Sequence, residues 1–320
     1  MKNPDFHRLI EHAIKAPSGH NTQPWLFSIE NDGITISPDL TRRLPVVDPQ
    51  NRELFISLGC AAENLHLAAR HHGYADTISI SDAGEIHVTL TPQDGIQPDP
   101  LFDQIPVRQT NRSACDGRSL SQELLDGIIT QAQIPGVHLQ TWDRSSSGFA
   151  RLAELVMVGN LAQLDSEAFR NELLSWIRVN RAQSNRTLDG LSYAVMGAPN
   201  LPAWITRPII RRALNGEKQN RVDRKKIASS SHLLLLATDS DDPAAWVEAG
   251  RVLQRTLLLL SWHGIAHAHI NQPCEVPALR SRIGHEVGLH DVYPQILLRL
   301  GYAEPMPYSK RRPVEQVIRA

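Results

Sequence analysis

Two long apolar segments with the same ending constrain the fold of this chain more than any other feature. The first, RELFISLGCAAENLHLAARHHG, occupies residues 52–73, and the second, PAAWVEAGRVLQRTLLLLSWHG, occupies residues 243–264. Each pattern predicts a long, largely buried helix that ends at a glycine, the residue that favours the C′ position. Gly59 and Gly73 are spaced like Gly250 and Gly264, 14 positions apart. The sequence therefore predicts two equivalent central helices.

Each central helix is followed by two expected strands, at 77–80 and 85–90 in the first half and at 265–270 and 294–302 in the second. Upstream, FHRLIEHAIKAPSG resembles LLDGIITQAQIPG. We therefore expect an α+β fold of two fused repeats, residues 1–107 and 108–320, with an insertion at about 150–230. Chance similarity between two buried helices is the alternative, and the shared order of several features favours duplication.

Composition and charge exclude some classes of partner. The chain has 320 residues, of which 41% are hydrophobic, so it can bury a sizeable core. Its 33 Lys and Arg residues nearly balance 34 Asp and Glu residues, so no overall field attracts nucleic acid or an anionic membrane. We expect a small-molecule substrate, no nucleic-acid partner and no membrane partner, and any basic site must be local.

The N-terminal pattern MKNPDFHRLIEHAIKA is amphipathic and lacks the apolar core of a signal peptide, which predicts a cytoplasmic location. Cys60, Cys115 and Cys274 are scattered and odd in number, which argues against a disulfide framework or a zinc site. HEVGLH at 285–290 lacks the HExxH spacing, so we predict no metal site. The GxSxG, GxGxxG and GxxxxGK[ST] patterns do not occur, which weakens hydrolase, dinucleotide-fold and P-loop readings.

Three polar segments remain that could carry chemistry. APSGHNTQPW, residues 16–25, places amide and hydroxyl side chains between two prolines, and Asn and Gln offer a donor and an acceptor together. RQTNR, residues 108–112, and SKRRPVEQVI, residues 309–318, offer guanidinium groups that bind phosphate oxygens in bidentate fashion. By itself each segment is also typical of a turn or a solvated surface. Their combination favours an anionic cofactor.

The three segments together resemble motifs of the nitroreductase superfamily, whose members are flavin enzymes. APSGHNTQPW is similar to the loop of that superfamily that contacts FMN, and RQTNR is similar to its Arg-x-Ser-x-Arg phosphate motif. Here the loop precedes the arginine motif, an order similar to the single-chain, tandem Acg-type proteins. In that subfamily the region that corresponds to 150–230 looks like a lid over the flavin.

The resemblance implies a set of FMN-contacting residues. The phosphate would be held by Arg108, Thr110, Lys310 and Arg312, while Arg112 and Lys226 would stabilise negative charge at flavin N1 and O2. The ring, the ribityl chain and the region of flavin N5 would be contacted by Pro17, Ser18, Gly19, Asn21, Gln23, Ile270, Asn271 and Gln272. Thr110 replaces the commoner Ser and keeps the hydroxyl. Because no NTQPW counterpart follows Pro135, we expect one flavin in each chain.

Two functions stay open at this point. The first is an NAD(P)H-dependent oxidoreductase that passes electrons through FMN to nitroaromatic or quinone-like acceptors, and no general acid for it can be nominated from the sequence. The second is a protein that sequesters or stores FMN behind a closed lid. The fused repeats predict a pseudo-dimer within one chain, with the site shared by its two halves, and further homodimerisation is left open.

Overall fold

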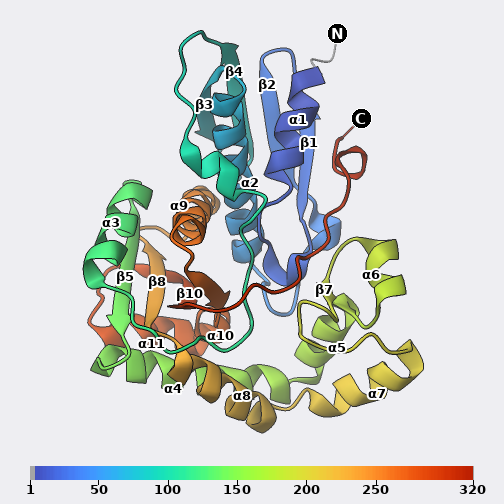
Figure 1. Cartoon of the computed structure of the whole chain (residues 1–320), viewed down its shortest axis with the longest axis vertical. Helices are drawn as coiled ribbons and strands as arrows, with labels where there is room; N and C mark the ends of the chain where they lie inside the picture. Colours follow the sequence, from blue (N-terminus) through green and yellow to red (C-terminus); the bar gives the residue numbers. More distant parts are fainter. Residues whose placement is uncertain (1–3, 320) are drawn as a thin grey trace. The chain divides into compact units, whose positions relative to one another are not determined.

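The computed structural model describes residues 4–319, which form two compact units (Figure 1). Unit 1 contains the described residues up to Arg108, the segment Asp241–Trp262 and the segment from Arg311 onward. Unit 2 contains Gln109–Ser240 and His263–Lys310. The chain passes from unit 1 to unit 2 one residue after the expected 107/108 boundary, and then returns twice. The two compact units are therefore not two contiguous halves, although the repeat prediction itself concerns the sequence.

The sheet of unit 1 is antiparallel and has the strand order β1-β2-β4-β3. Its alternating side chains bury one face, as the fully buried Phe27 and Ile36 on neighbouring strands illustrate. The strands are β1 (Trp25–Ile29), β2 (Gly33–Pro38), β3 (Tyr74–Ile80) and β4 (Ile86–Pro92). The expected strands after the first central helix are confirmed.

Three α-helices belong to unit 1: α1 (Pro4–Ala13), α2 (Arg52–His71) and α9 (Pro243–Trp262). Short 3-10 turns accompany them at Gly19–Asn21, Leu40–Arg42, Pro100–Gln104 and Val314–Gln316. The start of α2 is fixed by Asp48, whose Oδ2 accepts a hydrogen bond from the backbone N–H of Leu54 at 3.0 Å. Both predicted central helices, α2 and α9, are confirmed, and Gly73 and Gly264 have the positive φ that the sequence led us to expect after them.

Helices α2 and α9 cross at two glycines in equivalent surroundings. A Cβ on Gly59 would lie 1.9 Å from the carbonyl oxygen of Val247, and one on Gly250 would lie 2.0 Å from that of Ile56. Val247 and Gly250 lie 191 positions after Ile56 and Gly59, respectively. Each glycine therefore approaches the residue that corresponds to its partner's neighbour in the other helix, and the two contacts are equivalent. The crossing thus has the reciprocity of a two-fold interface formed by two copies of one helix.

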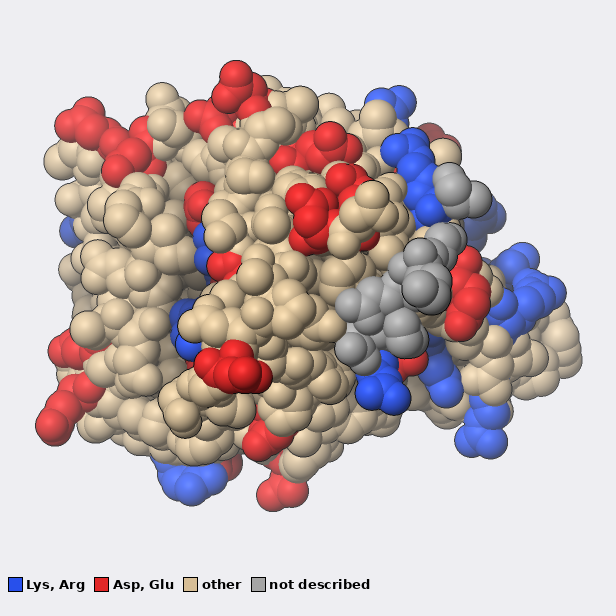
Figure 2. Space-filling model, turned by 90° about the horizontal axis from the view of Figure 1, so that it is seen from above, with Lys and Arg blue, Asp and Glu red and all other residues tan. Residues whose placement is uncertain are grey.

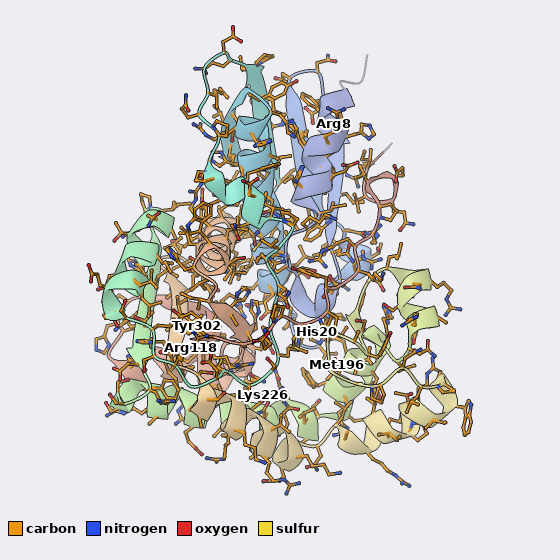
Figure 3. The ribbon with its side chains drawn as sticks, viewed as in Figure 1. Arg8, His20, Arg118, Met196, Lys226 and Tyr302 are labelled. Carbon is orange, nitrogen blue, oxygen red and sulfur yellow. The ribbon has the colours of Figure 1, made fainter. Side chains whose placement is uncertain are left out.

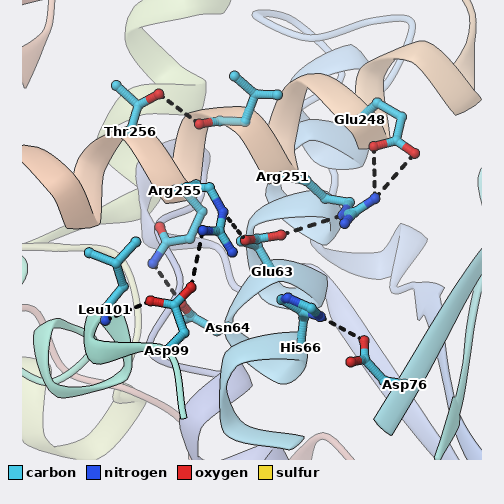
Figure 4. Close-up of polar contacts among 12 residues, drawn as sticks. Glu63, Asn64, His66, Asp76, Asp99, Leu101, Glu248, Arg251, Arg255 and Thr256 are labelled. Carbon is cyan, nitrogen blue, oxygen red and sulfur yellow. Dashed lines mark hydrogen bonds and ion pairs between the residues drawn. The ribbon is translucent and has the colours of Figure 1, made fainter. Parts of the chain in front are cut away.

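Polar contacts beside this crossing neutralise a buried carboxylate (Figure 4). Glu63 on α2 is 1% exposed, and its two carboxylate oxygens lie 2.7 Å from Nε of Arg255 and 3.5 Å from Nε of Arg251 on α9. Asn64 accepts a hydrogen bond from Nε2 of Gln254 at 2.6 Å. These pairs offset the desolvation of a charge that would otherwise destabilise the helix interface.

Unit 2 repeats the strand order of unit 1. Its antiparallel sheet has the order β5-β8-β10-β9, and the elements that correspond to α1-β1-β2-α2-β3-β4 follow each other in the same sequence. The strands are β5 (Val137–Asp143), β8 (His232–Thr238), β9 (Ala266–His269) and β10 (Tyr293–Gly301), and the helix that corresponds to α1 is α3 (Gln122–Ala132). The α+β fold class is confirmed, and the matching order supports the predicted duplication.

The insertion in the second half lies between β5 and β8 and is mostly helical (Figure 1). It contains α4 (Ser147–Asp165), α5 (Glu167–Trp176), α6 (Arg181–Thr187), α7 (Ala203–Ala213), α8 (Gly216–Ser229), and the short parallel pair β6 (Ile177–Arg178) and β7 (Leu191–Ser192). Two more helices, α10 (Gln272–Glu275) and α11 (Pro277–Val287), connect β9 to β10. One face of α4 packs with α11 and the sheet in a common hydrophobic core, represented by Leu152, Ile283 and Leu297.

Acidic and basic side chains both occur on the face in Figure 2, with more of the basic ones towards its right edge, and neither kind covers the surface. This matches the formal net charge of −1. Among the helices of residues 4–319, we find none with the length and apolar character needed to span a bilayer. The described cysteines Cys60, Cys115 and Cys274 are all thiols.

Candidate functional site

The loop before β1 has an unusual backbone conformation. His20, Asn21 and Gln23 have φ values of 48°, 56° and 54°, in the left-handed region that residues other than glycine adopt at a cost. Ser18 helps to hold the loop, because its Oγ accepts a hydrogen bond from the backbone N–H of Gln23 at 2.9 Å. A strained conformation that is held by specific contacts is typical of a binding loop.

The C-terminal segment completes this loop within unit 1. The segment is anchored on β1, where the N–H of Phe27 donates to the carbonyl oxygen of Val317 at 2.8 Å. The Arg311 guanidinium then donates to Oδ1 of Asn21 at 3.0 Å, and the backbone N–H of Arg312 donates to Oε1 of Gln23 at 2.7 Å. The amide oxygens predicted to face a cofactor are thus already engaged by the tail.

Two guanidinium groups converge beside this loop. Nη2 of Arg108 and Nη2 of Arg311 both donate to the carbonyl oxygen of Lys15, at 3.0 Å and 3.1 Å. Burial of the Arg311 guanidinium, followed by the positive charge of Arg108, lowers the pKa of Arg311 to about 9. Two cations held this close favour a nearby anion. We call Asn21, Gln23, Arg108, Arg311 and Arg312 the amide–arginine cluster.

Unit 2 contains a cavity of about 410 Å³, which is within the size range of small-molecule sites. It is lined by the insertion on one side and by β9, α10 and β10 on the other. Lys226 on α8 and Met196, which follows β7, are both labelled in Figure 3. We call this space the cationic cavity, and its lining residues are Arg112, Asn160, Gln163, Leu164, Phe169, Leu173, Ile177, Leu191, Met196, Leu214, Gln219, Val222, Asp223, Lys226, Ala268, His269, Ile270, Gln272 and Arg299.

Three cations share this cavity. Burial lowers the pKa of Arg112, Lys226 and Arg299 in each case, and the neighbouring positive charges of Arg112 and Arg299 lower that of Lys226 further. Asp223 is the one Asp or Glu among the residues that line the cavity, and it partly opposes the effect on Lys226. The cavity therefore has an excess of positive charge and would stabilise an anionic group.

The backbone around RQTNR fixes two of these cations. Thr110 forms an isolated parallel bridge with His267, and the N–H of Asn111 donates to the His267 carbonyl oxygen at 2.8 Å, which aligns the segment beside β9. Arg299 on β10 is 3% exposed and donates to the carbonyl oxygens of Asn111 and Ser113 at 3.0 Å and 2.6 Å. Arg112 is therefore presented to the cavity from a short extended segment that Arg299 supports.

The remaining walls are of two kinds. Amides form one of them, where Gln272 Nε2 donates to Asn160 Oδ1 at 3.0 Å and Asn160 Nδ2 donates to Asp223 at 2.9 Å. Apolar side chains such as Phe169 and Ile270 form another. A flat ring with apolar faces and a polar, partly anionic rim fits this combination. The donor set is therefore compatible with an isoalloxazine ring.

The structure brings the predicted residues together in two groups. Asn21, Gln23, Arg108 and Arg312 belong to the amide–arginine cluster of unit 1, and Ser18 contacts Gln23 beside it. Arg112, Lys226, Ile270 and Gln272 line the cationic cavity of unit 2. Pro17 and Gly19 belong to the same loop as Asn21. The Asn271 side chain is used within the fold, since its Oδ1 accepts from the N–H of Leu297 at 2.9 Å.

Lys310, another residue expected at the phosphate, lines a second cavity. It belongs to unit 2, where it lines a smaller cavity of about 300 Å³ with Arg181, Tyr193 and Tyr308. Arg312, the other tail residue expected at the phosphate, belongs to unit 1. Assignment of Lys310 to the phosphate stays a prediction. The effect of a Lys310 substitution on FMN affinity can test it.

Two residues were missed by sequence reasoning. Arg311 lies in the basic C-terminal segment, but its neighbours Lys310 and Arg312 were the residues predicted to bind the phosphate. Arg299 is a single charge inside the apolar strand pattern PQILLRLGY, and a buried charge without a structural reason indicates function. That local mismatch was the signal that could have identified it.

Comparisons with known proteins agree with the motifs. No protein-family model matches the chain. It is 27% identical to "Putative NAD(P)H nitroreductase Rv3131" of Mycobacterium tuberculosis over 320 residues, which cover 96% of this chain and 88% of that protein. It is 22% identical to "Putative NAD(P)H nitroreductase acg" of the same organism over 336 residues, which cover 96% and 93%. The resemblance to the Acg-type branch of the nitroreductase superfamily is thereby confirmed.

Solved structures that resemble the chain are more distant. The FMN and NADPH-dependent nitroreductase NfnB of a Sphingopyxis strain has a TM-score of 0.46 at 16% identity, covering 69% of this chain and 99% of that one. The FMN-dependent nitroreductase NfnB of Mycobacterium smegmatis, in complex with NADPH, has a TM-score of 0.44 at 15% identity, covering 68% and 96%.

Proposed function

We propose that this chain is an FMN-dependent oxidoreductase of nitroreductase type that takes electrons from NAD(P)H. The observation that carries the proposal is the cationic cavity, where Arg112, Lys226 and Arg299 face one space that also has an apolar wall. The names of the Mycobacterium tuberculosis relatives, which describe NAD(P)H nitroreductases, support the same activity. Nitroaromatic or quinone-like compounds are the proposed acceptors.

The three cations have a defined role in this proposal. When bound, FMN supplies the hydride chemistry, and the protein supplies position and electrostatic stabilisation. Arg112 and Lys226 would hold the pyrimidine side of the ring, where fixed positive charge favours the anionic reduced state. Arg299 would keep the Arg112 segment in place through its bonds to Asn111 and Ser113. The apolar wall with Phe169 and Ile270 would exclude water from the ring.

The amide–arginine cluster is the proposed binding group for the phosphate. Arg108 and Arg311 are already held on the Lys15 carbonyl, so their side chains need little ordering to bind an anion. A phosphate oxygen would also offset the burial of the Arg311 guanidinium and its repulsion by Arg108, the two causes that lower the pKa of Arg311. Thr110 and Lys310 remain proposed ligands on the strength of the motif alone.

The alternative proposal is an FMN-sequestering protein with little turnover. One observation favours it: residues of the insertion, such as Phe169, Met196 and Leu214, form much of the wall of the cationic cavity. If these side chains fill the space over the flavin that a nicotinamide must enter, binding would be tight and reduction slow. The two proposals differ in turnover and agree on the cofactor.

The experiment that separates them is anaerobic reduction of the purified, yellow protein. If the chain is an oxidoreductase, addition of NADPH or NADH should rapidly bleach the absorbance of the bound flavin. A yellow protein that both donors leave unbleached would support sequestration. A colourless protein that does not bind added FMN would overturn both proposals.

A matched pair of variants tests the role of the cavity. Lys226→Gln removes a cation that lines the cavity, whereas Lys225→Gln removes an exposed cation one residue away on α8. We expect Lys226→Gln to lower the flavin midpoint potential and to slow reduction, with Lys225→Gln unchanged. Equal behaviour of the two variants would contradict the assignment of the ring to this cavity.

A further inference from the structure

The insertion carries a helix whose surface differs from the rest of the chain. In α7 (Ala203–Ala213), drawn in yellow in Figure 1, Thr206 is the one described residue that is buried. Trp204 is 77% exposed and Ile209 is 56% exposed, values that are high for large apolar side chains. Leu201, just before the helix, is 38% exposed. The helix is thus attached to unit 2 by a narrow face.

The exposed side of α7 combines an aromatic ring with cations. Trp204, Arg207 and Arg211 are spaced i, i+3 and i+7, so they share one face of the helix. Arg212 lies at the next position and is also exposed. Aromatic and aliphatic side chains between arginines are typical of helices that lie in a membrane interface, where the rings enter the headgroup region and the cations bind phosphates.

The local charge is positive even though the whole chain is nearly neutral. Residues 191–216 contain three arginines and no Asp, Glu or Lys, and the acidic residues that flank this segment along the chain are Asp189 and Glu217. Asp189 is already paired with Arg178 at 2.8 Å. The net charge of −1 therefore excludes attraction by the whole chain but leaves a local basic patch. Such a patch attracts an anionic surface over about a Debye length.

We propose that α7 docks this protein on the surface of anionic lipid bilayers, with Trp204 inserted among headgroups and Arg207, Arg211 and Arg212 against lipid phosphates. A second copy of the chain is a poorer occupant, because an isologous contact through α7 would bring the same arginines together. Duplex nucleic acid would use the arginines but would leave the Trp204 ring exposed. The inference does not depend on the flavin or on the proposed enzyme activity.

The test is sedimentation of the full chain with vesicles. We expect binding to vesicles of phosphatidylcholine mixed with phosphatidylglycerol, no binding to vesicles of phosphatidylcholine alone, and release by added salt. The triple variant R207Q/R211Q/R212Q should bind anionic vesicles about a hundredfold more weakly, because each cation near the surface raises the binding constant by roughly fivefold. Trp204→Glu should weaken binding at least about tenfold, since a ring is replaced by an anion.

Two controls change the same properties elsewhere. R43Q/R144Q/R282Q removes three exposed arginines from other elements, and Trp262→Glu replaces another exposed tryptophan, 50% exposed at the end of α9. Both should bind anionic vesicles like the parent chain. Absence of binding to anionic vesicles, equal loss in both triple variants, or binding of duplex DNA in place of vesicles would each overturn the proposal. Circular dichroism of every variant confirms that the comparison is between folded proteins.

Discussion

At the scale of single residues, two arginines from distant parts of the sequence illustrate how unit 1 prepares an anion site. Arg108 and Arg311 share the Lys15 carbonyl oxygen, and the Arg311 guanidinium also binds Asn21. Folding has therefore already placed the two like charges at a fixed separation. Through Lys15 and the Asn21 side chain, the same contacts tie the C-terminal segment to the loop.

Arg108→Ala tests the phosphate assignment. A charge-assisted hydrogen bond contributes about 1.5–3 kcal/mol, so FMN affinity should fall roughly tenfold to a hundredfold. The measurement is fluorescence titration of the apoprotein with FMN, and Arg43→Ala, at an exposed position, is the control. An unchanged dissociation constant for Arg108→Ala would remove this arginine from the proposed site.

The glycines at the α2–α9 crossing give a second residue-scale prediction. Gly59→Ala and Gly250→Ala each force a Cβ within 2.0 Å of a backbone carbonyl oxygen, so each should destabilise the fold by about 1–3 kcal/mol or more. Because the two surroundings are reciprocal, the two losses should be similar. Urea unfolding measures them.

The control for these variants is Gly127→Ala in α3. A Cβ at Gly127 would meet nothing within 4 Å, so alanine should stabilise the helix by about 0.5–1 kcal/mol. If Gly59→Ala were as stable as the parent chain, the close approach of the two helices would be contradicted.

At the scale of elements, the packing of α1 beside the end of α2 depends on an uncharged histidine. His12 in α1 lies with its ring centroid 4.6 Å from that of Phe102 and 6.2 Å from that of His72. Burial, followed by the positive charges that His72, His71 and Lys15 can carry, lowers the pKa of His12 to about 4. The neutral ring is therefore the form that the folded state favours.

The pH dependence of stability follows from this lowered pKa. An unfolded chain takes up the His12 proton near pH 6.5, whereas the folded chain takes it up only near pH 4. Stability from this group is complete above pH 6.5 and is lost as the pH falls from 6.5 towards 4. His12→Gln should flatten the unfolding free energy over this range in urea titrations at several pH values.

The exposed His290 supplies the comparison for that titration. His290→Gln should retain the slope of the parent chain, because its side chain is exposed. A parental slope in His12→Gln would show that another group is responsible.

At the scale of the whole molecule, both sheets have the same order of corresponding strands, yet the amide-rich loop and the cavity-forming insertion each occur once along the chain. The loop NTQPW precedes β1 and has no counterpart before β5, while the insertion separates β5 from β8 alone. Two sheets of matching strand order with unequal loops should carry one cofactor site.

The stoichiometry of FMN is therefore predicted to be one per chain. Saturated protein can be freed of unbound FMN, denatured, and assayed for released flavin against protein concentration. A ratio near two would contradict the assignment of a single site. A ratio near zero would contradict the cofactor itself.

Much of this architecture could be predicted from the sequence, because it depends on local patterns. The apolar periodicity of residues 52–71 and the glycine after it fixed α2 and its end, and the same pattern predicted α9. The loop and arginine motifs also led to predicted site residues such as Asn21, Arg108 and Arg112, whose roles stay predictions. Hydrophobic period and glycine conformation are properties of neighbouring residues, so one sequence suffices to read them.

Only the tertiary structure decided which charges meet. The resemblance had grouped Lys226 with Arg112, but Arg299 belongs to a strand, and no local pattern relates it to either of them. Arg311, rather than Lys310, joined Arg108 because pairing of the C-terminal segment with β1 sets which tail side chains face the loop. Desolvation and the proximity of like charges depend on distances through space, so the positive character of the cavity and the lowered pKa of its cations emerge only from the fold.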